Sequence, residues 1–537
     1  MLRQGLPDTL PAVSTPAPRT LGELLAPFSP EYRGCGPSDE VPALAVDSRA
    51  VTPGAVFIAL RGETHDAHAF ISQAIAGGAS ALIVERGRLP ALQHPHVTLA
   101  NTGAALPRIA AAFHGWPGEQ LRIAGLTGTN GKTTTTYLVS AMLAAAERRH
   151  ARLGTVSNWL VDSEEESGFT TPFPLELQAL LAEVGRRRGT DVVMEVSSHA
   201  LAQGRIRPLR FRAVGMTSFS QDHLDFHGTM DAYLEAKLRL VGDHLAEDGV
   251  AVAAVDDHPA CAAFLAHAGP NTRRWRASRR PESGAELRVL RALDDPKLGT
   301  AVEIATPAGS GLLRSPLVGA FNLDNLLVAV GLGLGLDLDL ATILAALERS
   351  PGAPGRLERI TISDPPQASE GPEVYVDYAH TPEAVAHTLQ TLRSRCRGRL
   401  LVLLGCGGDR DRGKRPHMGH FAAAGSDRFY ATSDNPRTED PQAIIDDMLA
   451  ELPRAERRKV IVEADRRVAI AQAIAESGAD DIVLIAGKGH EDYQVLGTTK
   501  IPFSDAEEAR KGLLKICEDD AGVQVRAPCP PGSKPKA

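Results

Sequence analysis

Residues 121–134 decide the fold, and they read Leu-Arg-Ile-Ala-Gly-Leu-Thr-Gly-Thr-Asn-Gly-Lys-Thr-Thr. The apolar segment 121–126 predicts a short buried strand, and the segment 135–146 predicts a helix. A P-loop has this order: strand, glycine-rich loop, lysine, hydroxyl residue and helix. Its backbone N–H groups and helix N-terminus bind phosphate oxygens, and its lysine reaches the terminal phosphates. Nucleotide binding is therefore a better interpretation than a simple tight turn.

The loop departs from the strict P-loop pattern at one position. The strict spacing requires glycine where Leu126 stands, and the glycine lies one place earlier, at Gly125. The Gly-Lys-Thr-Thr ending is intact, with a hydroxyl at Thr133 that would hold Mg²⁺. We predict that the nucleotide phosphates contact Gly128, Thr129, Asn130, Gly131, Lys132, Thr133 and Thr134.

A second apolar run, residues 191–195, ends in the carboxylate of Glu195. Mg²⁺ prefers oxygen ligands and is usually held by one or two carboxylates together with phosphate oxygens, so we predict Glu195 as its protein carboxylate ligand. Without the preceding loop, a strand-terminal glutamate facing solvent would be the default interpretation. The sequence has no Asn-Lys-x-Asp motif, which disfavours a guanine-specific switch protein.

Residues 220–228 are rich in histidine and aspartate, and a predicted helix carrying Lys237 follows them. A solvated turn and an exposed helix lysine would have the same pattern. Spacing alone does not decide between a solvated segment and a catalytic one.

Length and composition indicate several globular units. The chain has 537 residues, and about 150 residues per domain predicts three or four units. Apolar β-like runs alternate with Ala- and Leu-rich helical stretches, which predicts an α/β protein with mostly parallel sheets. Pro-Gly seams place the domains at 20–116, 117–351 and 352–518, with unstructured tails at 1–19 and 519–537.

Charge and apolar patterning exclude several classes of protein. Lys and Arg number 58 and Asp and Glu number 66, so the net charge is −8, which favours neither nucleic acid nor an anionic membrane as a partner. We find no secretory signal and no apolar run that could span a bilayer. The six scattered cysteines indicate free thiols in a reducing compartment, and we expect a cytoplasmic monomer.

Several further motifs occur in order along the chain. They comprise the P-loop, Glu195-Val196-Ser197-Ser198-His199, Asp222-His223-Leu224-Asp225, Phe321-Asn322-Leu323-Asp324-Asn325, Gly355-Arg356-Leu357-Glu358, Asp377-Tyr378-Ala379-His380-Thr381-Pro382, the glycine-rich segment 405–416, Asp434-Asn435-Pro436-Arg437 and Gly487-Lys488-Gly489-His490-Glu491. Together they resemble the Mur ligase family of ATP-dependent amino-acid ligases in peptidoglycan synthesis. The resemblance covers nearly everything between residues 40 and 510. It implies three domains, with a central P-loop ATPase domain and a Rossmann-like C-terminal domain.

The resemblance also implies roles for individual residues. Lys132, Glu195, His223 and Lys237 are expected to be catalytic, with Lys237 carbamylated and supporting a second Mg²⁺ together with His223. ATP is expected to contact Asn322, Arg356, Asp377 and His380 as well as the P-loop. The UDP-sugar and its muramoyl-dipeptide end are expected to contact Val46, Ser48, Thr170, Thr171, Ser197, Gln203 and Arg205.

The third domain is expected to bind the incoming amino acid. Three predicted strands, 400–404, 429–431 and 482–485, end in polar loops, and ligands bind outside the carboxyl ends of such strands. Two arginines and two acids suit a zwitterion with an extra carboxylate, which arginine can bind with two hydrogen bonds. By the family match, meso-diaminopimelate contacts Arg410, Asp434, Asn435, Pro436, Arg437, Gly487 and Glu491.

The resemblance implies that ATP phosphorylates the D-glutamyl γ-carboxylate of UDP-N-acetylmuramoyl-L-alanyl-D-glutamate and that an amine then attacks the acyl phosphate. L-Lysine or L-ornithine remains an alternative amino acid. A folylpolyglutamate synthetase-like ligase shares the last two domains, but the segments 46–49 and 434–437 speak against it. A regulatory protein without catalysis would be expected to lack Glu195, His223 or Lys237, and all three are present.

Overall fold

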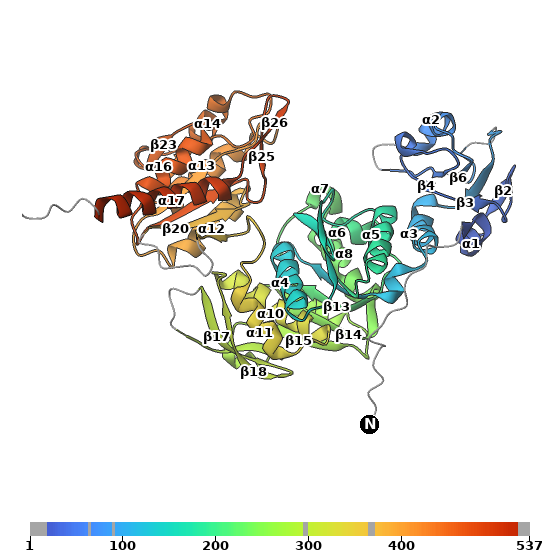
Figure 1. The fold of residues 1–537 in the computed structure, drawn as a ribbon, viewed down its shortest axis with the longest axis horizontal. Coiled ribbons are helices and arrows are strands. Elements are labelled where there is room, and N and C mark those ends of the chain that lie inside the picture. Colours follow the sequence, from blue (N-terminus) through green and yellow to red (C-terminus); the bar gives the residue numbers. More distant parts are fainter. Residues whose placement is uncertain (1–18, 63–65, 89–91, 294–298, 363–370, 525–537) are drawn as a thin grey trace, which may run out of the picture. The chain divides into compact units, whose positions relative to one another are not determined.

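The computed structural model describes residues 19–62, 66–88, 92–293, 299–362 and 371–524. Each of the three predicted domains contributes its own main β-sheet with helices beside it, so the α/β prediction is confirmed (Figure 1). By internal contacts, the described residues form two compact units. The first comprises the residues up to Leu290 with Ile304–Gly311 and Asp324–Ala346, and the second comprises the remainder.

The N-terminal sheet has five strands in the order β2-β7-β6-β5-β4. The strands β4 to β7 are parallel, and β2 is antiparallel to β7. Its elements are α1 Leu21–Leu25, β2 Glu31–Arg33, β4 Leu44–Ala45, β5 Val56–Ile58, α2 Ile71–Ala76, β6 Ala81–Glu85, β7 His96–Leu99 and α3 Thr102–Phe113. A separate two-stranded ladder joins β1 Arg19–Thr20 to β3 Glu40–Val41.

The central sheet has eleven strands in the order β11-β10-β9-β12-β8-β13-β14-β15-β16-β17-β18. Its strands are β8 Arg122–Thr127, β9 His150–Leu153, β10 Ser157–Leu160, β11 Ser163–Glu166, β12 Asp191–Glu195, β13 Phe211–Met216, β14 Leu245–Ala254, β15 Arg273–Ser278, β16 Leu287–Ala292, β17 Thr300–Thr306 and β18 Gly309–Ser315. Its helices are α4 Lys132–Ala145, α5 Pro174–Arg186, α6 Ser198–Ala202, α7 Leu224–His227, α8 Met230–Asp243, α9 Pro259–Ala266, α10 Ala320–Gly335 and α11 Leu340–Arg349.

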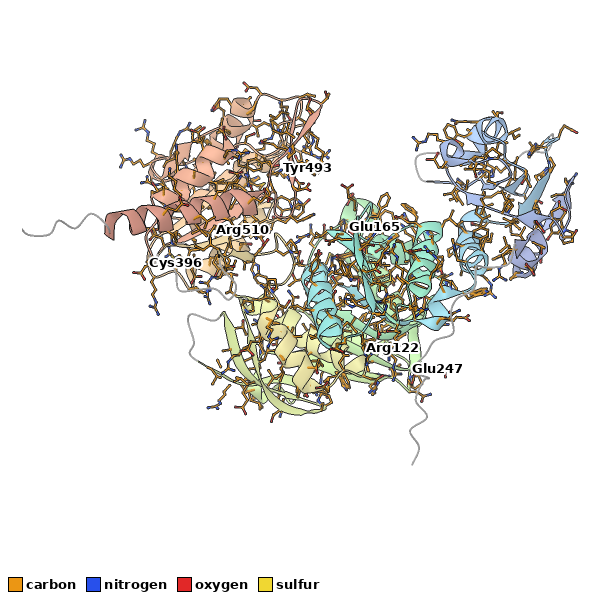
Figure 2. All side chains as sticks on the ribbon, in the orientation of Figure 1. Arg122, Glu165, Glu247, Cys396, Tyr493 and Arg510 are labelled. Atoms are coloured by element: carbon orange, nitrogen blue, oxygen red, sulfur yellow. The ribbon has the colours of Figure 1, made fainter. Side chains whose placement is uncertain are left out.

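The pairing of β8 positions the predicted active site. This strand lies between β12 and β13 and is parallel to both, so the P-loop after β8 and the carboxylate that ends β12 lie at the same edge of the sheet. At the opposite edge, Arg122, which Figure 2 labels, pairs through its guanidinium with the buried Asp191 carboxylate at 2.8 Å. All the residues of β12 are buried, which explains its continuous apolar sequence before Glu195.

The C-terminal sheet has six strands in the order β19-β20-β24-β21-β22-β23. The strands β20 to β24 are parallel, so their carboxyl ends share one edge. The elements are β19 Glu358–Ile360, β20 Glu373–Asp377, α12 Pro382–Arg393, β21 Leu400–Leu404, α13 Lys414–Gly425, β22 Arg428–Ala431, α14 Pro441–Leu449, α15 Arg454–Arg457, β23 Val460–Val462, α16 Arg466–Ala475, β24 Ile482–Ala486, β25 Tyr493–Leu496, β26 Thr499–Pro502 and α17 Asp505–Gln524.

The predicted tails are too long at both ends. Arg19 belongs to β1, where it pairs with Val41, and α17 continues to Gln524 rather than ending at 518. The first proline after this helix is Pro528, so no missing backbone N–H interrupts it earlier. The predicted tail segments 1–18 and 525–537 lie outside the described residues.

Within the described ranges, no helix is both long enough and apolar enough to cross a bilayer. The five cysteines in those ranges (Cys35, Cys261, Cys396, Cys406 and Cys517) are free thiols.

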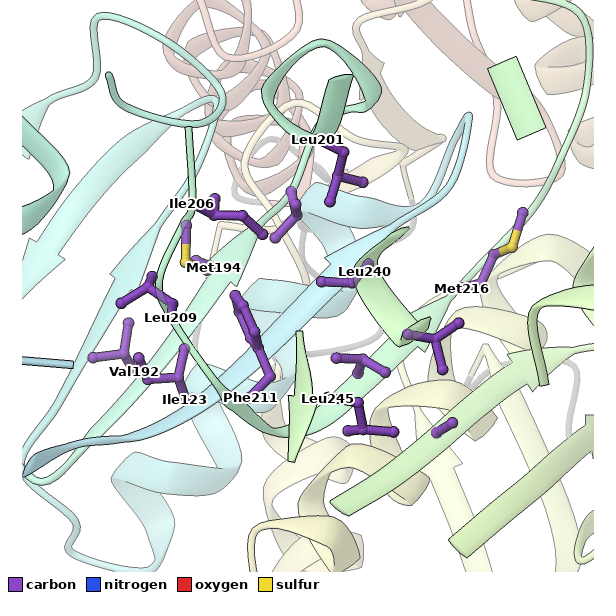
Figure 3. Close-up of a cluster of buried hydrophobic side chains, with 14 of the residues drawn as sticks. Ile123, Val192, Met194, Leu201, Ile206, Leu209, Phe211, Met216, Leu240 and Leu245 are labelled. Atoms are coloured by element: carbon purple, nitrogen blue, oxygen red, sulfur yellow. The ribbon is translucent and has the colours of Figure 1, made fainter. Parts of the chain in front are cut away.

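The core beneath the central sheet explains the unusual position of Gly125. Ile123, Val192 and Phe211 belong to one buried cluster, drawn in Figure 3. A Cβ atom on Gly125 would lie 2.6 Å from Cε1 of Phe211, whose side chain is fully buried. Glycine is therefore needed in the strand for packing, and not for the phosphate turn itself.

We predict that Gly125→Ala lowers the free energy of unfolding by roughly 1–3 kcal/mol, because the close-packed Phe211 ring must shift. Urea unfolding followed by circular dichroism would measure this change. Gly168→Ala is the matched control, since a Cβ there meets no atom within 4 Å. Equal stability of the two variants would contradict the packing explanation.

Candidate active site

The P-loop has the backbone that its glycines predict. Gly128 and Gly131 have φ angles of +144° and +87°, and α4 begins directly after the loop, at Lys132. The Lys132 ammonium donates hydrogen bonds of 2.9 Å to the carbonyls of Gly128 and Thr129. Non-glycine residues rarely adopt such φ angles, so the loop places its backbone N–H groups only with glycine at these positions.

Glu195 connects the P-loop to the next loops. Its side chain is 1% exposed, and its carboxylate accepts hydrogen bonds from the Thr133 hydroxyl at 3.0 Å and from the Thr155 N–H at 2.8 Å. The Thr155 hydroxyl donates a third, at 3.1 Å. The two predicted Mg²⁺ ligands, Thr133 and Glu195, are therefore in direct contact. A hydroxyl and a carboxylate oxygen are the hard oxygen donors that Mg²⁺ prefers.

Lys237 lies on α8 and is almost completely buried, at 1% exposed. Its Nζ donates to the Gly128 carbonyl at 3.0 Å and lies 4.4 Å from the centre of the Tyr233 ring. Burial, reinforced by repulsion from Lys132, holds the pKa of Lys237 well below its ordinary value. The amine is therefore biased towards its neutral, nucleophilic form.

His223 lies in the loop before α7 and is more accessible than Lys237. Its ring is 46% exposed and its Nε2 is 3.3 Å from the Asp222 carboxylate. The ring centre of His223 is 6.2 Å from that of Tyr233, which also flanks Lys237. In the described part of the chain, no group of three or more His, Cys, Asp or Glu side chains could hold a metal ion. A metal site at His223 would need further ligands, and a carbamylated Lys237 as one of them stays a prediction.

The predicted muramoyl-dipeptide residues lie together beside Glu195. The buried Thr171 hydroxyl donates to the Glu195 carbonyl at 2.9 Å and accepts from the Ser197 N–H at 3.0 Å. The Thr170 hydroxyl is 3.1 Å from that of Thr155. The Arg205 guanidinium donates to the Thr171 carbonyl, and also to Gln203 at 2.8 Å. The structure thus joins all five residues to the end of β12.

The predicted uridine residues lie after β4. Val46 packs against the N-terminal core, and the Ser48 hydroxyl donates to the Gln73 side chain at 2.9 Å. Asp47 caps the following turn by accepting from the Arg49 N–H. The segment is ordered by these local hydrogen bonds, and its role in binding stays a prediction.

The second unit carries four predicted ATP contacts. The half-buried Asp377 carboxylate accepts from the Leu357 N–H at 2.6 Å; loss of hydration raises the pKa of Asp377, and Arg356 opposes that shift. The Arg356 guanidinium lies 4.7 Å from the Tyr378 ring centre, and His380 Nδ1 is 2.7 Å from the Tyr378 carbonyl. Arg356 and His380 therefore both lie beside the Tyr378 ring, and Asp377 precedes that tyrosine in the chain. Asn322 is buried and donates to the Val318 carbonyl.

The three predicted amino-acid loops meet at the carboxyl edge of the C-terminal sheet. Asn435 donates from Nδ2 to the Glu491 carboxylate at 2.8 Å, and the Arg437 guanidinium donates to the Gly408 carbonyl at 2.7 Å. Asp434 Oδ2 lies 2.8 Å from the position that a Cβ would take on Gly487. Gly487 has a φ of +113°, so the loop approaches Asp434 closely only with glycine there.

The remaining two predicted contacts flank this junction. Arg410 is exposed beside Gly407, whose added Cβ would lie 3.6 Å from the Arg410 Cγ. A Cβ on Gly408 would overlap the Pro436 carbonyl, so the loops after β21 and β22 are in contact. The geometry confirms that the three loops converge; the role of each residue in binding stays a prediction.

Sequence reasoning missed several residues that support these sites. Tyr233 is 3.2 Å from the Thr129 hydroxyl, and burial raises the pKa of Tyr233 to about 12. Thr155, which donates twice to Glu195, follows no recognisable motif. Lys488 lies inside the Gly487–Glu491 motif, but nothing in the sequence indicates that its ammonium donates to both Asn435 and Glu491. Arg466 opens an ordinary amphipathic helix, and only tertiary structure shows its position.

Three family models match consecutive parts of the chain. The model of the Mur ligase family catalytic domain matches residues 40–114, and that of the Mur ligase middle domain matches residues 126–333. The model of the Mur ligase glutamate ligase domain matches residues 355–489. Together the matches cover all three sheets.

Relatives and solved structures agree with these models. A UDP-N-acetylmuramoyl-L-alanyl-D-glutamate–2,6-diaminopimelate ligase of Gloeobacter violaceus is 45% identical over 496 residues, 92% of this chain and 98% of that protein. A solved structure of a ligase with the same name is 31% identical, has a TM-score of 0.69 and covers 93% of this chain and 100% of its own. Folylpolyglutamate synthase of Mycobacterium tuberculosis complexed with ADP shares the fold, with a TM-score of 0.54 and 20% identity over 71% of this chain and 91% of its own.

We predict that Lys237 makes stability depend on pH. Because the pKa of Lys237 is lowered in the folded protein, the unfolded chain binds more protons between the folded and unfolded pKa values, and the free energy of unfolding rises with pH there. In carbon dioxide-free buffer, the wild type should gain stability relative to Lys237→Met as the pH rises towards the ordinary pKa of a lysine. Urea unfolding at each pH measures the difference.

The control for this experiment is Lys459→Met, which removes a partly exposed lysine that donates to the Ala423 and Ser426 carbonyls. Its stability difference from the wild type should change less with pH. A Lys237→Met difference that is constant across the range would show that the Lys237 amine is not desolvated in the folded state.

Proposed function

Because the chain belongs to the Mur ligase family, we propose that it joins meso-diaminopimelate to UDP-N-acetylmuramoyl-L-alanyl-D-glutamate at the expense of ATP. The observation that carries the amino-acid assignment is the junction of the Asp434–Arg437 loop with Gly408 and Glu491. There, the exposed Arg410 and the half-buried Arg437 lie near the carboxylates of Asp434 and Glu491. This set of charges suits the second amino-carboxylate centre of meso-diaminopimelate. L-Lysine carries only an ammonium at that end.

The P-loop would bind the ATP phosphates. Its N–H groups and the α4 N-terminus provide positive potential, and the Lys132 ammonium would exchange the two loop carbonyls for phosphate oxygens. Phosphoryl transfer needs mainly positioning and charge neutralisation from the protein. Arg356, Asp377 and His380 would contribute further ATP contacts from the second unit.

The residues present fit a magnesium ion at Thr133 and Glu195. Their oxygens are 3.0 Å apart and mostly shielded from solvent. When bound, Mg²⁺ neutralises phosphate charge. Glu195 would also keep the Thr133 hydroxyl oriented, since it accepts that hydrogen bond.

Lys237 fits a metal only after modification. A protonated ammonium repels cations, whereas its neutral amine can add to carbon dioxide with release of one proton, which leaves an anionic carbamate. The lowered pKa of Lys237 supplies the neutral amine, and the carbamate would lie near the Lys132 ammonium that disfavours a second positive charge. Together with His223 the carbamate would support a second Mg²⁺, as the family resemblance implies.

The acceptor would lie between Glu195 and the residues predicted to bind the muramoyl-dipeptide end, which are Thr170, Thr171, Ser197, Gln203 and Arg205. The D-glutamyl γ-carboxylate attacks the γ-phosphorus of ATP, the bond to the bridging oxygen breaks, and ADP leaves. The diaminopimelate amine then attacks the acyl carbon, loses a proton and expels phosphate, which forms the amide. Arg205 would orient the acceptor, because its guanidinium is held by Gln203 and the Thr171 carbonyl. We place the reaction in the cytoplasm and assign it to the monomer.

We predict that the purified protein releases phosphate and forms the tripeptide product when it is given ATP, Mg²⁺, the UDP-muramoyl dipeptide and meso-diaminopimelate. L-Lysine, L-ornithine and L-glutamate are supplied separately, and the products are identified by mass spectrometry. Product with lysine or ornithine but not with diaminopimelate would refute the amino-acid assignment. A parallel reaction supplies a folate and L-glutamate in place of the muramoyl dipeptide and the diamino acid. Glutamylation of the folate without any product from the muramoyl dipeptide would refute the assigned acceptor.

We predict that Arg437→Ala raises the KM for diaminopimelate at least about tenfold, because a charge-assisted hydrogen bond is worth roughly 1.5–3 kcal/mol. The KM for ATP should change less than about twofold, a margin well under 1 kcal/mol. Arg393→Ala is the control, since Arg393 pairs with Asp427 near the amino ends of the same strands. Equal increases in both KM values for Arg437→Ala would contradict its assigned contact.

A further inference from the structure

Two cations outside the predicted amino-acid contacts lie directly beneath that site. Arg466 is 1% exposed and Lys488 is 0% exposed, although each carries a full charge on a long side chain. Burying a charge is costly unless it is paired and hydrogen-bonded. Their retention at the junction of the substrate loops therefore calls for a specific role.

Arg466 joins two strands that are not neighbours. Its guanidinium donates to the Ala486 carbonyl at 2.9 Å and to the Ser433 carbonyl at 3.4 Å. Ala486 ends β24, Ser433 follows β22, and β21 lies between these strands in the sheet. The strand β21 pairs with both of these strands, and Arg466 adds a direct side-chain link between their ends, next to the residues that follow, Asp434 and Gly487.

The Arg466 guanidinium is itself fixed by a buried ion pair. Asp505, the first residue of α17, accepts from Nε and Nη2 at 2.7 Å each, and its side chain is also fully buried. Nη2 also donates to the Ala486 carbonyl and Nη1 donates to the Ser433 carbonyl, so all three guanidinium nitrogens are engaged. Arginine alone has the planar fork of donors that can satisfy all of these acceptors at once.

Lys488 links the same loops from the other side. Its ammonium donates to the Glu491 carboxylate at 2.9 Å and to the Asn435 side-chain oxygen at 3.3 Å. The Nζ is 5.5 Å from the centre of the Tyr493 ring, which Figure 2 labels. Asn435 in turn donates to the same Glu491 oxygen, so three side chains form one closed network.

On the basis of the proposed function, we propose that Arg466 and Lys488 are positioning residues for amino-acid recognition, which hold the Asp434–Asn435 and Gly487–Glu491 loops at the spacing that fits the substrate. Neither residue needs to contact the amino acid. Arg466 would act through the two strand-end carbonyls, and Lys488 would act through Asn435 and Glu491.

The same two cations also balance the charge of the site. Burial raises the pKa of Asp434, Arg466 and Lys488 oppose the shift, and Glu491 and Asp505 reinforce it. The other titratable groups that interact with Asp434 are Cys406, Tyr378 and Tyr493, and these stay neutral near pH 7 because burial raises their pKa values. Removing Lys488 should therefore let Asp434 take up a proton at a higher pH than in the wild type.

The test compares Lys488→Met and Arg466→Lys with the wild type in the full ligation assay, with each substrate varied in turn. We expect Lys488→Met to raise the KM for diaminopimelate at least about tenfold, with KM values for ATP and the UDP-muramoyl dipeptide within about twofold. The increase should grow as the pH is lowered, because Asp434 is protonated more readily once the Lys488 charge is removed. Arg466→Lys keeps the charge but cannot span both carbonyls, so it should raise the same KM without the added pH dependence.

The matched control for lost lysine hydrogen bonds is Lys459→Met. In the wild type, the Lys459 ammonium donates to the Ala423 and Ser426 carbonyls, near the amino ends of the strands. Thermal unfolding of every variant separates misfolding from altered recognition. Parallel changes in all three KM values, or a diaminopimelate KM within twofold of the wild type in both variants, would overturn the positioning role. Failure of the wild type to use diaminopimelate would refute the proposed function separately. The KM ratios of variant to wild type would then be measured with the diamino acid that the wild type does use. A wild type that uses no diamino acid would overturn both proposals.

Discussion

The hydrogen bonds that the Glu195 carboxylate accepts are the interactions on which the active site of the first unit depends. This carboxylate is removed from solvent at the end of β12 and accepts hydrogen bonds from Thr133 on the nucleotide side and from Thr155 on the acceptor side. Its backbone carbonyl accepts the Thr171 hydroxyl in the loop predicted to bind the muramoyl peptide. In the proposed reaction, this one residue would align the phosphate donor with the carboxylate acceptor, and such alignment is what phosphoryl transfer requires from a protein.

The proposed amino-acid site also depends on buried charges at strand ends, but these charges are the cations of Arg466 and Lys488 and not a carboxylate. Here cations lie underneath and the polar loop residues lie above them. Arg466 bridges strand ends that share no ladder, whereas β12 and β8 are adjacent and need no such bridge. The chain carries a net charge of −8, so its binding of anionic substrates rests on locally placed cations.

Local pattern was sufficient to predict the elements that carry the site. The strands 191–195 and 400–404 have the predicted bounds, because a continuous apolar run followed by polar residues marks a buried parallel strand. The convergence of three loops followed from strand direction alone. Long-range packing was not predictable: Gly125 is explained by Phe211 on another strand, and Arg466 by carbonyls on two others. The burial of Lys237 also has no sequence signature, since the predicted helix could equally have exposed it.

Transfer of oxygen from the acceptor to phosphate tests the central claim, that the acceptor carboxylate attacks ATP directly in the active site around Glu195. The UDP-muramoyl dipeptide would carry ¹⁸O in both oxygens of its D-glutamyl γ-carboxylate, and the released phosphate would be analysed by mass spectrometry after a single round of ligation. Direct attack leaves one labelled oxygen on each phosphate, because the acyl C–O bond breaks when the amine adds. Unlabelled phosphate, or label recovered in AMP, would contradict the account.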